Sequence, residues 1–301
     1  MNPYLPDGVS RDLYPFTGKF ITLKSGAKMH CLDEGKGKPV VMLHGNPSWS
    51  FYYRNLALAL RNASRVIAPD HIGCGLSDKP GDDRYEYTLK SRVDDLESLL
   101  DGLGVKENIT LVVHDWGGMI GMAYAARHTE RIEKLVILNT GAFFLPDGKA
   151  FPPALRLCRT PLGAALIRGF NAFARGAAWV GCKRRRMGGE LRRAYAAPYN
   201  NWANRIATLR FVEDIPLAPG DKAYPLVYET QEKLNSLAAL PMLICWGMKD
   251  FVFDHYFLEE WKRRFPRAEI HSFPDCGHYI LEDAQEEVVP LIKNFIKNAR
   301  T

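Results

Sequence analysis

The run 111–119, LVVHDWGGM, constrains this chain of 301 residues more than any other segment. The apolar residues from Ile109 predict a buried strand, and the pattern after the two glycines predicts a helix that continues to Ala126. A strand, a sharp turn and a helix in this order form a nucleophile elbow, which presents a reactive side chain at the end of a sheet. The nucleophile position holds Asp115, so we expect a carboxylate that attacks carbon and becomes an ester of the enzyme.

The chain as a whole has the pattern of an α/β fold with a doubly wound, mostly parallel sheet. Apolar runs predict eight strands, at 19–24, 28–33, 39–44, 65–70, 109–114, 134–139, 242–247 and 268–273. The inner runs are continuously apolar, which is typical of parallel strands covered on both faces. The first two runs predict an antiparallel hairpin at the sheet edge. Amphipathic helices are predicted at 89–103, with Thr88 as N-cap, and at about 283–298.

The alternation of strands and helices stops after Asn139 and resumes at Pro241. The block between them is rich in Ala, Arg, Phe and Pro and predicts short helices, which we interpret as a cap inserted after the sixth strand. We therefore expect a core of residues 1–141 and 236–301, with a helical cap at 142–235. The large apolar residues of the cap suit either a long-chain hydrophobic substrate or burial of the cap against the core; they are Phe151, Leu155, Leu162, Phe170, Phe173 and Trp179.

Three further polar motifs follow predicted strands, at the sheet edge where ligands bind in open α/β folds. Asn46 follows the third strand in HGNP, Asp250 follows the seventh in GMKD, and His278 follows the eighth in DCGH. Each motif also has a non-catalytic interpretation when it is taken alone. Asp250 could be a turn residue, and His278 could be a surface histidine. Together with Asp115 they have the chain order nucleophile, acid, histidine of a catalytic triad. We predict Asp115 as the nucleophile, His278 as the base and Asp250 as the acid that orients it.

Two N–H donors near the elbow are suited to stabilising a leaving anion. Trp116 offers an indole N–H and Asn46 a side-chain amide, and such a pair fits a departing anion better than a neutral group. The alternative role for Trp116 is that of a core aromatic residue. The sixth strand ends in Asn139 and Thr140 without a carboxylate, which excludes that strand end as the source of the acid.

The motifs HGNPSWS, DHIGCGLSDKP, VVHDWGG, GMKD and DCGHY together resemble the haloalkane dehalogenase family of the α/β-hydrolase superfamily. The resemblance covers essentially the whole chain outside the cap. It implies that Asp115 attacks carbon, that the leaving group departs toward Trp116 and Asn46, and that water activated by His278 hydrolyses the ester.

The segment PSWSFYYRNL and the cap look more like the β-lactone decarboxylases of bacterial long-chain olefin biosynthesis, which share this pattern of site residues. That resemblance implies decarboxylation of cis-3,4-dialkyl β-lactones, the cis-3-alkyl-4-alkyloxetan-2-ones, to cis-alkenes and CO2. It implies neither a cofactor nor a metal.

Other functions remain open at this point. Hydrolytic dehalogenation of haloalkanes would use the same residues. Epoxide hydrolases also use an aspartate elbow, with cap tyrosines that polarise the epoxide; the candidates are Tyr195, Tyr199, Tyr224 and Tyr228. The pairing of Trp116 with Asn46 argues against that class. A catalytically inactive scaffold would bind partners only through the cap, and the intact triad counts against it.

Charge is distributed unevenly along the chain. Residues 148–231 hold 14 Lys and Arg against 5 Asp and Glu, whereas the whole chain has a formal net charge of +6. The run from Lys183 to Arg186, followed by Arg192 and Arg193, predicts either a solvated helix face or a surface that meets anionic lipid or an acidic partner. Other olefin-pathway enzymes in a multi-enzyme assembly are candidate partners. A nucleic-acid partner is not expected, because the basic region contains no recognisable module.

The cysteine pattern and the absence of long apolar segments bear on location. The six cysteines form neither a C-x-x-C pair nor a zinc-ligand spacing, which favours a reducing compartment. The N-terminal segment lacks the apolar core of a secretory signal, and no run of 18 apolar residues exists. We therefore expect a cytoplasmic protein whose membrane association, where it occurs, is peripheral.

Overall fold

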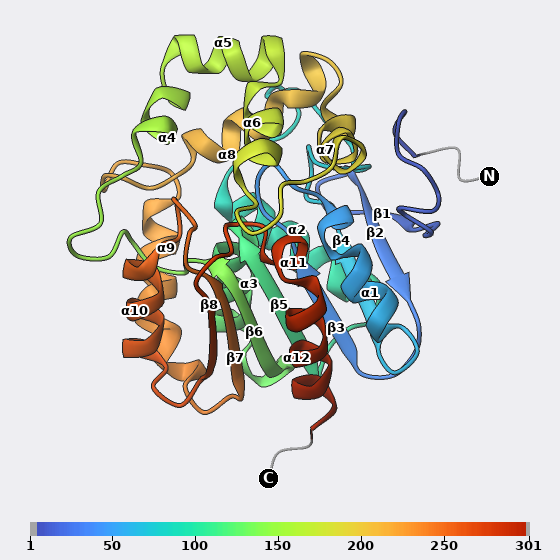
Figure 1. Cartoon of the computed structure of the whole chain (residues 1–301), viewed down its shortest axis with the longest axis vertical. Helices are drawn as coiled ribbons and strands as arrows, with labels where there is room; N and C mark the ends of the chain where they lie inside the picture. The colour runs from blue at the N-terminus through green and yellow to red at the C-terminus, as the bar shows by residue number, and fades with distance from the viewer. Residues whose placement is uncertain (1–4, 299–301) are drawn as a thin grey trace.

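The computed structural model describes residues 5–298. At its centre lies an eight-stranded sheet with the order β1-β2-β4-β3-β5-β6-β7-β8 (Figure 1). The strands are β1 Lys19–Thr22, β2 Lys28–Glu34, β3 Pro39–Leu43, β4 Arg65–Pro69, β5 Ile109–Asp115, β6 Ile132–Thr140, β7 Met242–Gly247 and β8 Glu269–Phe273. β1 pairs antiparallel with β2 and β2 antiparallel with β4, while all other pairs are parallel. The predicted α/β sheet and its edge hairpin are confirmed.

Helices cover both faces of the sheet, as the apolar inner strands require. One layer contains α2 (Leu89–Gly102), α3 (Trp116–Arg127), α9 (Tyr224–Lys233) and α10 (His255–Arg264); the other contains α1 (Arg54–Leu60), α11 (Ile280–Asp283) and α12 (Gln285–Lys297). Each layer buries its own apolar cluster against the sheet. The sheet is therefore a rigid platform whose carboxyl edge can hold side chains in fixed positions.

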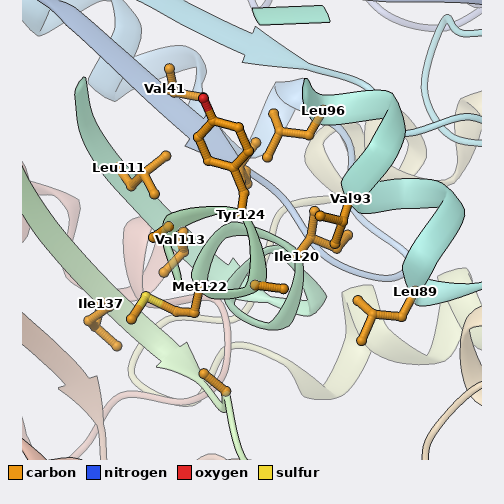
Figure 2. Close-up of a cluster of buried hydrophobic side chains, with 14 of the residues drawn as sticks. Val41, Leu89, Val93, Leu96, Leu111, Val113, Ile120, Met122, Tyr124 and Ile137 are labelled. Atoms are coloured by element: carbon orange, nitrogen blue, oxygen red, sulfur yellow. The ribbon is translucent and has the colours of Figure 1, made fainter. Parts of the chain in front are cut away.

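Successive side chains of the central strand β5 pack alternately against the two helical layers. Leu111 and Val113 lie in the cluster beneath α2 and α3 (Figure 2), whereas Val112 between them lies in the opposite cluster. This alternation follows from the two-residue period of a strand. The hydroxyl oxygen of Thr88 accepts a hydrogen bond from the backbone N–H of Ser91 at 3.2 Å, which confirms the predicted N-cap of α2.

The last predicted helix differs from the observed one at its start. The pattern predicted a single helix from about residue 283, whereas α11 ends at Asp283 and α12 begins at Gln285. The residue between them, Ala284, has φ −134° and ψ 35°, which is outside the helical region. The chain thus turns between the two helices, and α11 lies directly after the loop that carries His278.

Between β6 and β7 the chain forms a group of helices above the carboxyl ends of the strands (Figure 1). They are α4 Pro153–Cys158, α5 Pro161–Phe170, α6 Ala172–Val180, α7 Gly189–Ala196 and α8 Ile206–Glu213. The next helix, α9, instead packs against α3 of the core layer. The division into core and cap at residues 142 and 235 stays a prediction. Within residues 5–298, no helix has the length and apolar character needed to cross a bilayer.

Candidate active site

The elbow at the end of β5 places Asp115 in a strained backbone conformation. Its φ is 51° and its ψ −127°, where side chains rarely occur because Cβ meets the neighbouring carbonyl group. The two glycines that follow are required by close packing. A Cβ at Gly117 would lie 1.9 Å from the carbonyl oxygen of Leu43, and one at Gly118 would lie 1.8 Å from Oγ1 of Thr140. The Asp-Trp-Gly-Gly sequence therefore lets α3 start directly beneath the carboxylate.

Backbone donors hold the Asp115 carboxylate. Its Oδ1 accepts a hydrogen bond from the backbone N–H of Asn46 at 2.6 Å, and the backbone N–H of Trp116 also donates to this carboxylate. Oδ2 lies 3.7 Å from Nε2 of His278. Asp115 lines a cavity, so this geometry leaves Oδ2 as the oxygen that can attack a substrate. The two N–H groups can hold the carbonyl oxygen of an ester formed there.

The histidine is oriented by the predicted acid. Nδ1 of His278 donates to Oδ2 of Asp250 at 2.7 Å, and Oδ1 of Asp250 accepts from the backbone N–H of Val252 at 2.8 Å. Nε2 is consequently turned toward Asp115. The structure thus brings Asp115 together with Asp250 and His278, which lie more than a hundred positions later in the sequence. The catalytic roles of the three residues stay a prediction.

Asn139, at the end of β6, supports the acid and was not predicted as a site residue. Its Nδ2 donates to Oδ2 of Asp250 at 3.1 Å, while its Oδ1 accepts from the backbone N–H of Gly247 at 2.8 Å. Asn139 has φ 33°. The sequence does contain a signal for this role, namely a polar residue that ends a buried strand beside the strand carrying the acid.

Burial and charge shift the ionisation of the two facing groups. Burial raises the pKa of Asp115 above its usual value, and the nearby His278 opposes that shift only in part. Burial by itself would lower the pKa of His278, but the carboxylates of Asp250 and Asp115 outweigh it, and the net pKa is raised. His278 therefore keeps a proton more readily than a free histidine does, and its positive form stabilises negative charge at the elbow.

We predict that turnover is lost at low pH with a midpoint above the ordinary aspartate pKa of 3.8. Only ionised Asp115 can attack, and a raised pKa means that this group becomes protonated at a higher pH than a free aspartate does. Rates measured at saturating substrate from pH 4 to pH 9, on enzyme preincubated at each pH, would check this. An acid midpoint at or below the ordinary value would contradict the assignment.

The two predicted anion donors differ in the hydrogen bonds that they make. Nδ2 of Asn46 donates to the carbonyl oxygen of Thr208 in α8 at 3.0 Å, which leaves its second N–H for a ligand. The indole N–H of Trp116 has no hydrogen-bond partner within residues 5–298, and its ring lies 5.3 Å from that of Phe211. Both residues line the cavity. Trp116 is thus placed at the site rather than only in the core.

An apolar cavity of about 400 Å³ lies over the triad. Asp115, Trp116, Asn46 and His278 form its polar end, and α4, α5 and α6 supply part of its apolar wall. The predicted cap residues divide into two groups. Phe151, Leu155 and Phe173 line the cavity. Leu162, Phe170 and Trp179 neither line it nor bury the cap against the core, because their exposed fractions are 63%, 70% and 55%.

The candidate tyrosines of an epoxide hydrolase do not reach the cavity. The hydroxyl of Tyr195 donates to Glu282 at 2.6 Å, and that of Tyr199 donates to the carbonyl oxygen of Ser48 at 3.0 Å. Neither they nor Tyr224 and Tyr228 line the cavity. The described part of the chain therefore offers no tyrosine that could polarise an epoxide at Asp115. Residues 5–298 also contain no cluster of three or more His, Cys, Asp or Glu that could hold a metal ion.

Comparison with known proteins identifies the family. The model of the alpha/beta hydrolase fold matches residues 38–285. The chain belongs to the α/β-hydrolase family. Two relatives of this α/β-hydrolase are named cis-3-alkyl-4-alkyloxetan-2-one decarboxylase. The Shewanella oneidensis protein is 61% identical over 96% of this chain and 91% of its own length. The Xanthomonas campestris protein is 50% identical over 94% of this chain and 97% of its own.

Among solved structures, this α/β-hydrolase is similar to the haloalkane dehalogenase DbeA of Bradyrhizobium elkani. The TM-score is 0.82 at 26% sequence identity, and the match covers 93% of this chain and 97% of that one. The predicted resemblance, both to dehalogenases and to β-lactone decarboxylases, is confirmed.

Proposed function

We propose that this protein decarboxylates cis-3-alkyl-4-alkyloxetan-2-ones to cis-alkenes and CO2, with Asp115 as the nucleophile. The observation that carries the proposal is the 61% identity, over 96% of the chain, to a protein named for this reaction. The cavity supports it, because an apolar chamber with a single polar end suits a substrate with two alkyl groups on one reactive ring. The product belongs to long-chain olefin biosynthesis.

In the first step, Oδ2 of Asp115 attacks the ring carbon that bears the ring oxygen. A carbon–oxygen bond forms to the enzyme, the ring carbon–oxygen bond breaks with inversion, and the electron pair leaves as the substrate's own carboxylate. Trp116 and Asn46 donate to that carboxylate, in the position where a dehalogenase would hold halide. Protonated His278 adds favourable charge.

In the second step, the β-acyloxy carboxylate fragments. The bond to the carboxylate carbon breaks to release CO2, its electrons form the double bond, and the bond to Asp115 breaks to restore the free carboxylate. Inversion followed by anti elimination converts a cis-lactone into a cis-alkene. Every atom is accounted for without water, so His278 and Asp250 act electrostatically or in a side hydrolysis. The competing route is attack at the ring carbonyl, followed by hydrolysis to a β-hydroxy acid.

The alternative function is haloalkane dehalogenation, which the same residues could perform and which the likeness to DbeA favours. A paired assay tests the two: alkene from a cis-β-lactone by gas chromatography, and halide release from bromoalkanes. We expect alkene well above the thermal background and halide release at least about 100-fold less efficient. Alkene at background level would overturn the proposal, and efficient halide release would establish the alternative.

We propose further that the basic cap contacts a partner. The excess of Lys and Arg over residues 148–231 supports an anionic lipid surface or an assembly with other enzymes of olefin synthesis. A cytoplasmic location stays a prediction from the cysteine pattern.

A further inference from the structure

Six large apolar side chains of the cap are exposed. They are Leu157, Leu162, Phe170, Trp179, Val180 and Trp202. All six lie on or beside α4, α5 and α6, the helices above the carboxyl edge of the sheet (Figure 1). We call this set the apolar cap face. Exposed large apolar side chains that gather on a few elements mark an interaction site.

Arginines accompany the aromatic residues of the apolar cap face. The guanidinium of Arg192 lies 3.7 Å from the ring centroid of Trp179, and that of Arg168 lies 4.8 Å from the ring centroid of Trp202. An indole beneath a guanidinium is a combination suited to the boundary between lipid headgroups and acyl chains, because one end is apolar and the other charged.

The chain segment that carries the apolar cap face is almost entirely positive in charge. Residues 150–205 contain 11 Lys and Arg and a single acidic residue, Glu190. Among these basic residues, Arg184 is the one that forms ion pairs with carboxylates in the described chain, to Asp275 and Glu287. The others form no ion pair with a carboxylate of residues 5–298, although Asp82 and Glu213 act on Arg168 at longer range. The excess of positive charge makes the surface complementary to an anionic one. Because Arg184 pairs with two carboxylates of the core, this residue of the run 183–186 faces the core.

The cavity reaches the surface at this same face. Leu157 and Val180 line the cavity and are also exposed, at 49% and 43%. They lie at the ends of α4 and α6. Phe251, in the loop after β7, also lines the cavity and is exposed at 44%. A lactone with two alkyl chains resides in lipid rather than in water, because each methylene group favours the apolar phase.

We propose that the apolar cap face docks on an anionic lipid bilayer and that the opening beside Leu157 and Val180 admits the lactone directly from the membrane. The lactone as the molecule admitted rests on the function proposed above, whereas the docking itself does not. A bilayer accounts for the aromatic residues, the unneutralised arginines and the placement of the opening together. An acidic protein partner accounts for the charge alone.

The test measures sedimentation with vesicles of phosphatidylcholine, with and without phosphatidylglycerol, for the full chain. The wild type should bind the anionic vesicles, and binding should weaken as salt rises. The double variant Phe170→Ser, Trp179→Ser should bind at least about tenfold more weakly. The matched control Tyr228→Ser removes an exposed aromatic outside this face and should bind like the wild type. Phe170 and Trp179 are exposed, so the double variant should keep its thermal unfolding temperature.

Measurements of turnover distinguish an effect on membrane docking from an effect on the catalytic reaction. On a long-chain lactone carried in anionic vesicles, the double variant should be at least about tenfold slower than the wild type, whereas both should turn over a short-chain lactone in buffer equally. Failure of the wild type to bind anionic vesicles, as a protein partner would predict, overturns the docking proposal. Equal binding by the double variant overturns it as well. Vesicle binding without turnover of any lactone would instead refute the proposed function and leave the docking intact.

Discussion

Replacement of Asp115 by alanine should reduce alkene formation at least about 1000-fold, to the uncatalysed background. The reason is that the side chain forms and then breaks the covalent bond to the substrate, and no neighbouring residue can replace it at the elbow. Gas chromatography of the alkene from a cis-β-lactone, with purified variant and wild type at equal concentration, measures the effect. Wild-type activity in the variant would show that the nucleophile has been assigned wrongly.

The same variant should remain folded. Burial raises the pKa of Asp115, so the ionised carboxylate is less favourable in the folded chain than in the unfolded one. Above the unfolded pKa, this group therefore lowers stability, and its removal should leave the unfolding temperature unchanged or higher.

A matched control for the alanine variant is Asp95→Ala. Asp95 is a buried aspartate on α2 with a raised pKa, and it does not line the cavity. This control should keep its turnover. Asp115→Asn is the poorer variant, because an activated water could restore the acid.

A single turnover in water enriched in heavy oxygen should leave the carboxylate of Asp115 unlabelled while alkene forms. On the proposed route, fragmentation rather than water releases Asp115, so both of its oxygens are retained. Mass spectrometry of the proteolytic peptide that carries Asp115, sampled as alkene appears, makes the measurement. Heavy oxygen in Asp115 at the rate of alkene release would mean that water attacks an ester in each cycle, and the route would be wrong.

The variant His278→Ala provides an independent check on the same step. A route that needs no water should still form alkene in this variant, at a rate lowered by the loss of the nearby positive charge. A route through ester hydrolysis should instead stop with substrate attached to Asp115, because the base that activates water is absent. Intact-mass measurement of the variant after mixing with the lactone distinguishes the two results.

Local patterns in the sequence were sufficient to predict the eight-stranded sheet, its edge hairpin, the N-cap at Thr88 and the elbow at Asp115. These features depend on residues that are near neighbours in the chain. A strand pattern reflects a two-residue period, and an elbow needs glycines where a Cβ would meet neighbouring atoms, as at Gly117 and Gly118. The order of Asp115, Asp250 and His278 followed from their positions at or after the ends of the fifth, seventh and eighth strands.

Only the tertiary structure decided which groups meet across long separations. Asn139 donates to Asp250 over 111 positions, and the backbone N–H of Asn46 reaches Asp115 over 69. No local pattern specifies such a contact, because it depends on strand order and on how far each loop extends. The cap residues make the same point: Phe173 lines the cavity while Trp179, six positions later in the same helix, faces outward. The sequence shows that both residues are apolar and aromatic. The packing of neighbouring helices decides which face of a short helix meets the core.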